Sequence, residues 1–85
     1  MGKYEPLRKH LVACRDKLKV RMTFAEVAAV LGTSLPNSAF KHRGWWANPV
    51  DATHRPHAAA WLDAGFEVES VKQDADNGWV EFVRK

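Results

Sequence analysis

The chain has few of the features that mark secreted, membrane-bound or disulfide-stabilised proteins. It holds a single cysteine, Cys14, among 85 residues, so no disulfide can form within it, and this favours a cytosolic protein. Its longest uncharged stretch, residues 27–40, is interrupted by Gly32 and Pro36. No secretion signal, transmembrane run or lipidation site is visible. The sequence therefore predicts a cytoplasmic protein that does not use a membrane.

Motifs for catalysis and metal binding are also missing. There is no glycine-rich phosphate loop, no nucleophile elbow and no His-Glu-x-x-His sequence. His54 and His57 have the spacing of two zinc ligands, but neither a cysteine pair nor a second histidine pair accompanies them. We therefore predict a protein that is not an enzyme, with no catalytic residues, no metal and no cofactor.

The length predicts a single domain over residues 1–85. A domain of this size buries only about 60–65% of the surface that its unfolded chain exposes, so its core must be compact. Large aromatic side chains meet that need, and the chain has four Trp and four Phe. We expect at least half of them to lie in the core.

Charge is unevenly divided along the chain. Residues 1–48 carry nine Lys and Arg against three Asp and Glu, a net charge of +6, whereas residues 49–85 carry four against seven, a net charge of −3. This asymmetry favours an anionic partner for the first part, most simply nucleic acid. A soluble helix with a lysine-rich outer face explains the same charge equally well.

Apolar spacing predicts the first elements. An amphipathic helix of about three turns is expected from apolar residues spaced by four, three and four, namely Leu7, Leu11, Cys14 and Leu18. Residues 19–23 then alternate polar with apolar side chains, as a short strand does.

Two further helices are predicted from their end signals. Thr23 and Glu26 form a capping box that starts the second helix, and Gly32 supplies the left-handed residue that ends it. Pro36 suits the first position of a third helix of about two turns, which stops near Gly44.

The rest of the chain predicts a helix and a β-hairpin. Thr53 is expected to cap a fourth helix that ends at Gly65. The two strands of the hairpin alternate in phase, with Phe66 and Val68 matched to Val80 and Phe82. Asp76-Asn77-Gly78 supplies residues that tolerate positive φ in a tight turn. Ser70-Val71 breaks the alternation, so we expect a bulge there.

This order of elements predicts an α+β fold of the winged helix-turn-helix type, with four helices, a short strand after the first helix and a C-terminal β-hairpin. The strand at 19–23 would pair with the hairpin. Around Gly32, Ala28 and Leu35 match the close-packed positions of a helix-turn-helix. Ser38 stands where an apolar residue is expected, which leaves the register of the third helix open by about one residue.

The segment Leu-Pro-Asn-Ser-Ala-Phe-Lys-His-Arg-Gly-Trp-Trp-Ala-Asn, residues 35–48, joins cations to two adjacent tryptophans. We predict that it binds DNA, because its residue types suit phosphates and base edges; these candidates are Asn37, Ser38, Lys41, His42 and Arg43. Cations of the first helix would contact the flanking backbone, namely Arg8, Lys9 and Arg15. A solvated connecting helix is the other interpretation.

Trp45 and Trp46 cannot point the same way, because adjacent residues in a regular backbone diverge. One of them is expected to close the core. The other can bind a partner or cap the edge of the core.

Motifs along nearly the whole chain resemble a family of small bacterial and phage domains of unknown function. They are Lys3-Tyr4-x-Pro6-Leu7, Met22-Thr23-Phe24-Ala25-Glu26-Val27 with Leu31-Gly32, Leu35-Pro36-x-Ser38-Ala39, His42-Arg43-x-Trp45-Trp46-x-Asn48, and Ala60-Trp61-x-x-Ala64-Gly65-Phe66-x-Val68. The resemblance implies one intact domain of prokaryotic or phage type. It implies no activity and no role for any residue.

The leading hypothesis from the sequence is a non-enzymatic protein that binds double-stranded DNA, as a transcriptional regulator or a phage accessory factor. The alternative is a protein–protein interaction module, in which Trp45 or Trp46 contacts a host protein or a second copy. The helix that reads the groove stays open between residues 36–43 and 53–65, where Arg55 and His57 lie.

Overall fold

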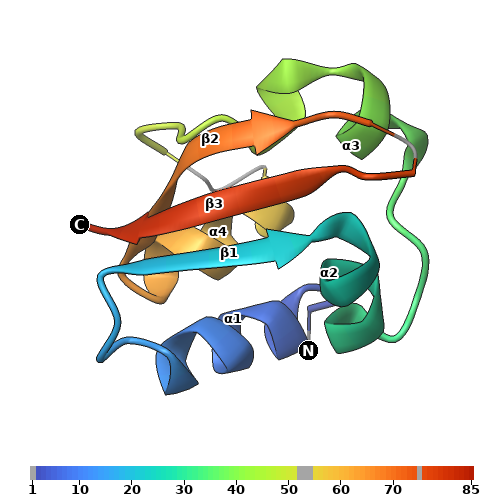
Figure 1. Ribbon diagram of the computed structural model, residues 1–85. Coiled ribbons are helices and arrows are strands. Elements are labelled where there is room, and N and C mark those ends of the chain that lie inside the picture. Colours follow the sequence, from blue (N-terminus) through green and yellow to red (C-terminus); the bar gives the residue numbers. More distant parts are fainter. Residues whose placement is uncertain (1, 52–54, 75) are drawn as a thin grey trace.

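The computed structural model describes residues 2–51, 55–74 and 76–85. Within these residues the chain is an α+β fold of four α-helices, a short 3₁₀ helix and one three-stranded antiparallel sheet (Figure 1). The elements in chain order are α1 (Glu5–Ala13), β1 (Lys19–Thr23), α2 (Phe24–Leu31), α3 (Asn37–Lys41), η1 (Arg43–Trp46), α4 (Pro56–Asp63), β2 (Phe66–Lys72) and β3 (Trp79–Arg84).

The sheet has the order β1-β3-β2, so the last strand lies in the middle. The predicted pairing of the first strand with the C-terminal hairpin is confirmed, with Val20 opposite Phe82 and Met22 opposite Val80. These side chains point to the helices, and α4 lies behind the sheet in Figure 1. The other face of the sheet carries no helix in this view.

Aromatic side chains dominate the core. Of the eight Trp and Phe side chains, five are buried, which confirms the expectation from composition. The Trp46 indole stacks against the ring of Phe24 at a centroid distance of 5.2 Å and against Trp61 at 5.6 Å. The largest fully buried side chains are Trp46, Trp61, Phe66, Phe82, Leu7, Leu11, Val27 and Val80.

Local sequence signals predicted several element ends correctly. The capping box at the start of α2 is confirmed, because Glu26 N donates to Thr23 Oγ1 at 3.0 Å and Thr23 N donates to Glu26 Oε1 at 2.8 Å. The α2 helix ends at Gly32, whose φ is 75°. Gly65, with φ 88°, lies in the turn between α4 and β2.

The first helix is shorter than the apolar spacing predicts. It ends at Ala13, and Leu18 lies beyond it with 72% of its surface exposed. The prediction that Leu18 belongs to the inner face of this helix is wrong. The chain leaves the helix in turns after Cys14, and Leu18 O accepts a backbone hydrogen bond from Arg84 N at 2.9 Å.

The third helix is also shorter than predicted, and Pro36 is its N-cap instead of its first residue. The α3 helix ends at Lys41, and His42 adopts an extended conformation before η1. A longer α-helix would need Ala39 O to accept from the amide of residue 43. That oxygen instead accepts from Trp46 Nε1 at 2.9 Å and from Gln73 Nε2 at 3.0 Å.

The hairpin differs from the prediction at its turn and at its bulge. Among the described residues, only Gly32 and Gly65 have positive φ, so the positive φ predicted for residues 76–78 is wrong. Gly78 meets a steric need instead, since a Cβ there would collide with the ring of Phe24 and the carbonyl of Asp74. The register shift lies between Val68 and Ser70, just before the predicted site.

Helix α4 begins at Pro56, with Arg55 as its N-cap residue. Thr53, the predicted cap, lies outside the described residues. None of the helices in the described ranges has the length and apolar character needed to cross a membrane.

Candidate nucleic-acid interface

The α3–η1 segment, residues 37–46, is anchored to the core at its C-terminal end. Trp46 is completely buried, and its Nε1 donates to Ala39 O at 2.9 Å. Phe40 packs edge-on against Phe24 of α2, with ring centroids 5.3 Å apart. The α3 helix packs mainly against η1 and contacts α2 less. The buried aromatic rings therefore hold one short turn in place at the surface.

Polar and cationic residues occupy the outer side of this segment. Four of its predicted DNA contacts are exposed and Ser38 is half-buried. Within the described part of the chain, neither Lys41 nor Arg43 forms an ion pair. The structure thus brings together four exposed candidates, namely Asn37, Lys41, His42 and Arg43.

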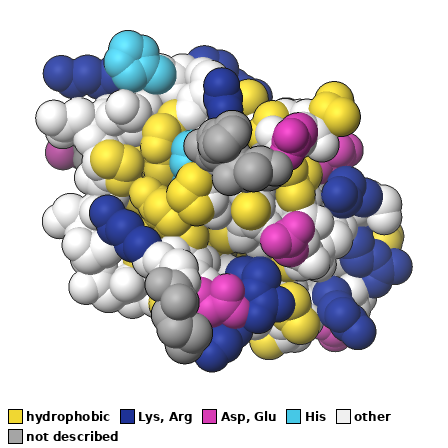
Figure 2. Space-filling model, turned by 180° about the vertical axis from the view of Figure 1, so that it is seen from behind, with side chains coloured by type: hydrophobic (Ala, Val, Ile, Leu, Met, Phe, Trp, Pro, Cys, Tyr) yellow, Lys and Arg dark blue, Asp and Glu magenta, His cyan; other side chains and the backbone are white. Residues whose placement is uncertain are grey.

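The two adjacent tryptophans have different surroundings, as predicted. Trp46 is fully buried, so it is removed from the candidate partner contacts. Trp45 is half-buried and stacks on His57, with centroids 4.2 Å apart and planes 8° apart. The Tyr4 ring packs edge-on against Trp45 at 6.1 Å. Figure 2 shows hydrophobic side chains gathered around a histidine on the face that is seen from behind.

His57 links this aromatic cluster to the first turn of α4. Its Nε2 is buried and has no hydrogen-bond partner among the described residues. Burial lowers the pKa of His57, a hydrogen bond with the Trp45 backbone opposes that shift, and the nearby Arg55 lowers the pKa further. A neutral ring packed between aromatic groups is more suited to structure than to contact with a phosphate.

Asn48 has a structural role that the sequence did not reveal. Its Nδ2 donates to Val68 O at 2.9 Å, and Val68 N donates to its Oδ1 at 2.9 Å. Trp61 Nε1 donates to the same Oδ1 at 3.1 Å. The side chain therefore completes the edge of β2 as a neighbouring strand would. The only hint in the sequence is an asparagine two residues after a tryptophan.

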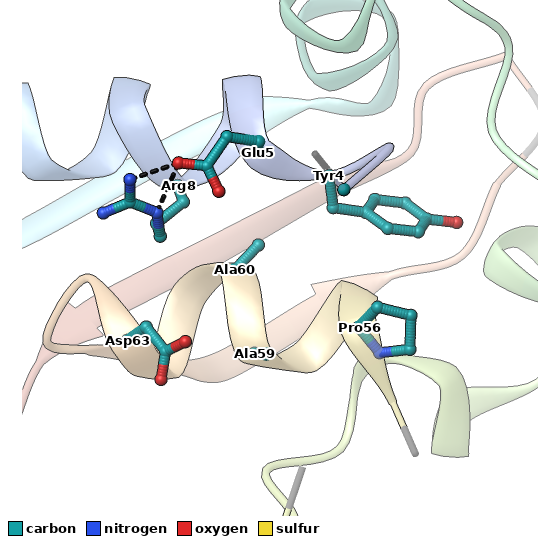
Figure 3. Close-up of a pocket in the computed structure, with 8 residues that line it drawn as sticks. Tyr4, Glu5, Arg8, Pro56, Ala59, Ala60 and Asp63 are labelled. Atoms are coloured by element: carbon teal, nitrogen blue, oxygen red, sulfur yellow. Dashed lines mark hydrogen bonds and ion pairs between the residues drawn. The ribbon is translucent and has the colours of Figure 1, made fainter. Parts of the chain in front are cut away.

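Arg8 differs from the other cations of the first helix. Its Nε donates to Glu5 Oε1 at 2.8 Å, and its Nη2 contacts the same oxygen. This hydrogen bond lowers the pKa of Glu5 and raises that of Arg8. Figure 3 shows the pair beside a small pocket between α1 and α4, with Asp63 on the opposite helix. The charge of Arg8 is thus already compensated.

Lys9 and Arg15 are exposed and form no ion pair with a described residue. They do not join the α3–η1 segment, because α1 and the turn that follows it lie along the bottom of the view in Figure 1, whereas α3 lies at its top. The predicted DNA contacts therefore fall into two separate groups. No group of residues in the described chain has the donors of a metal site.

Comparison with known proteins identifies the domain but not its activity. No curated protein and no solved structure matches the chain. A family match does cover residues 4–81, which include α1, the α3–η1 segment, Asn48 and most of the hairpin. On that match, the chain belongs to the family described as domain of unknown function DUF7662.

Proposed function

We propose that this chain is a non-enzymatic DNA-binding domain, and that the α3–η1 segment contacts the duplex. The observation that carries the proposal is the set of exposed side chains in this segment, Asn37, Lys41, His42 and Arg43. Neither Lys41 nor Arg43 has a carboxylate partner among the described residues. Unpaired Lys and Arg on a rigid turn suit a phosphate backbone. A role as a transcriptional regulator or a phage accessory factor would follow from such binding.

The element order and the β1-β3-β2 sheet also support a winged-helix-like arrangement. In this proposal Lys41 and Arg43 contact phosphates, with His42 beside them, while Asn37 and Ser38 reach base edges. Lys9 and Arg15 lie where they can contact flanking backbone outside that turn. Arg8 contributes less, because Glu5 already neutralises it.

Two neighbouring elements are less suited to the contact. The hairpin tip is acidic, and backbone hydrogen bonds from Asp76 and Asn77 lower the pKa of Asp74, so that its carboxyl group is ionised at neutral pH. Helix α4 offers Arg55 at its start but Asp63 at its end. We therefore assign groove contact to residues 37–43 in preference to α4 or the hairpin.

Fluorescence anisotropy on duplex DNA at several salt concentrations tests this proposal. The double variant Lys41→Gln/Arg43→Gln should bind more weakly, and the slope of log affinity against log salt should fall by about two, since each phosphate contact contributes about 0.9. The matched control is Lys19→Gln/Arg21→Gln, which removes the same charge from the open face of the sheet and should leave the slope unchanged. Absence of binding by the native chain in low salt would contradict the proposal.

A second candidate function is a protein–protein interaction module centred on Trp45. The half-buried indole packs against the rings of Tyr4 and His57, and aromatic side chains are frequent anchors of interfaces. In a pull-down, the native chain should capture its protein partner even after nuclease treatment. Trp45→Ala should abolish this capture, whereas the Lys41→Gln/Arg43→Gln variant should retain it. The molecular mass of the native chain, measured by analytical ultracentrifugation, shows whether the partner is a second copy of the chain or a different protein.

A further inference from the structure

A second group of cations lies at the end of the molecule opposite α3. Arg15, Arg84 and Lys85 line a hollow of about 340 Å³ together with Ala64 and Gly65. In Figure 1 the C-terminal residue is at the left edge of the view and α3 is at the upper right. The two groups of cations are therefore separate surfaces.

Hydrogen bonds join the chain segments that line this hollow. Lys85 N donates to Gly65 O at 2.9 Å, which joins the end of β3 to the turn after α4. Arg84 N donates to Leu18 O at 2.9 Å, and Arg84 Nη1 donates to Arg15 O. The Arg84 guanidinium group is thus positioned by the backbone of Arg15, whose own guanidinium group also lines the hollow. Three distant parts of the chain meet here, so the clustering of charge is a product of the fold.

No acidic side chain of the described residues lines the hollow. Its three cationic residues are all exposed, and none of them forms an ion pair with a described residue. By contrast, Lys19 pairs with Glu69 at 3.3 Å. Cationic side chains gathered without an acidic side chain repel one another, and a bound anion relieves that repulsion. Guanidinium groups in addition offer paired donors that match a phosphate.

We propose that Arg15, Arg84 and Lys85 form a second anion-binding site that takes a phosphate group. Resting on the proposed function, that group belongs to the backbone of the same duplex that the α3–η1 segment contacts. Figure 2 shows Lys and Arg side chains around the rim of the helix side of the molecule. The longest dimension of the molecule is 29 Å, so a duplex of about nine base pairs, at 3.4 Å each, is as long as the whole molecule.

The test uses the variant Arg15→Gln/Arg84→Gln, in which glutamine at position 84 keeps a donor for Arg15 O. The control variant is again Lys19→Gln/Arg21→Gln, which removes two exposed charges that are paired with Glu69 and Glu81 and do not line the hollow. Circular dichroism and thermal unfolding first verify that both variants are folded. Each protein is then titrated with a 20-base-pair duplex at several salt concentrations, and separately with inorganic phosphate and pyrophosphate while amide NMR shifts are followed.

The proposal expects the salt slope on the duplex to fall by about two in the hollow variant and to stay unchanged in the control. It also expects pyrophosphate to shift the amides of Arg15, Gly65 and Arg84 in the native chain and in the control variant, and not in the hollow variant. Duplex binding with an unchanged slope in the hollow variant would overturn the second site while the proposed function stands. Shifts at the hollow without any duplex binding would support an anion site for free phosphate and overturn DNA binding. Neither shifts nor duplex binding would overturn both.

Discussion

The open face of the sheet and the α3–η1 segment both carry exposed cations, but only the sheet face pairs them. On the sheet, Lys19 contacts Glu69 at 3.3 Å and Arg21 contacts Glu81 at 3.3 Å. The Arg21 guanidinium also lies over the Trp79 ring, 4.1 Å from its centroid. In the α3–η1 segment, Lys41 and Arg43 have no such partner among the described residues.

The difference shows why net charge is a poor guide to a binding surface. Residues 1–48 have a net charge of +6 by count, yet Lys19 and Arg21 belong to that count and are compensated by acids from the other half of the chain. Charge that the fold leaves uncompensated is the better indicator of an anionic partner. Among the described residues it includes Lys41 and Arg43 of the α3–η1 segment and the cations of the Arg15 hollow.

The largest expected effect comes from removing the anchor of the α3–η1 segment. Trp46→Ala should lower the free energy of unfolding by about 3–5 kcal/mol, because a buried indole is replaced by a cavity. Urea denaturation measures the change. Trp46→Phe, which keeps a ring but loses the bond to Ala39 O, should cost less. If Trp46→Ala were as stable as the native chain, the segment would not depend on this anchor.

A smaller loss is expected where the segment is joined to the sheet. Asn48→Ala should lower the free energy of unfolding by about 2–3 kcal/mol, because Val68 N, Val68 O and Trp61 Nε1 each lose a partner. Asn48→Asp is the control, since it retains the acceptor and loses only the donor. Equal stability of all three proteins would show that water replaces the amide at no cost.

The end of α3 and the hairpin turn show the limit of prediction from sequence. Local signals were sufficient for the capping box at Thr23, for Gly32 and for strand β1, since each depends on neighbours within a few residues. The early end of α3 depends on Gln73, which lies 34 residues after Ala39. Gly78 is needed because of Phe24, far away in sequence.

The candidate site was predictable to a similar extent. Residue types identified the cations of residues 41–43, and the divergence of adjacent side chains indicated that one tryptophan would be core. Which cations are compensated could not be predicted, because the partners of Lys19 and Arg21 are 50 and 60 residues away. The hollow at Arg15 was missed for the same reason, since Arg84 and Lys85 reach it only through strand pairing.

A double-mutant cycle measures how strongly the Arg21–Glu81 ion pair compensates a cation on the open face of the sheet. Arg21→Ala, Glu81→Ala and the double variant should give a coupling energy of about 0.2–1 kcal/mol, as exposed ion pairs do. Thermal unfolding at low and high salt measures it, and the coupling should weaken with salt. A coupling energy near zero would mean that the sheet cations are as free as those of the α3–η1 segment.

The smallest effect is expected from His57, which supports Trp45. Burial lowers the pKa of His57 in the folded chain, so as pH falls from about 6.5 the unfolded chain takes up a proton first. The free energy of unfolding should therefore decline over this range and level off below the folded pKa. His57→Gln should remove the decline and His42→Gln should retain it. A stability that rises toward lower pH in this range would contradict the assignment.

The central claim is that uncompensated cations, and not cations as such, make the contact with DNA. It is tested most directly by amide NMR shifts of the native chain during titration with duplex DNA. The account predicts that the amides of residues 37–43 shift while those of β1, with its paired Lys19 and Arg21, stay in place. Shifts confined to the sheet, with none at residues 37–43, would contradict it.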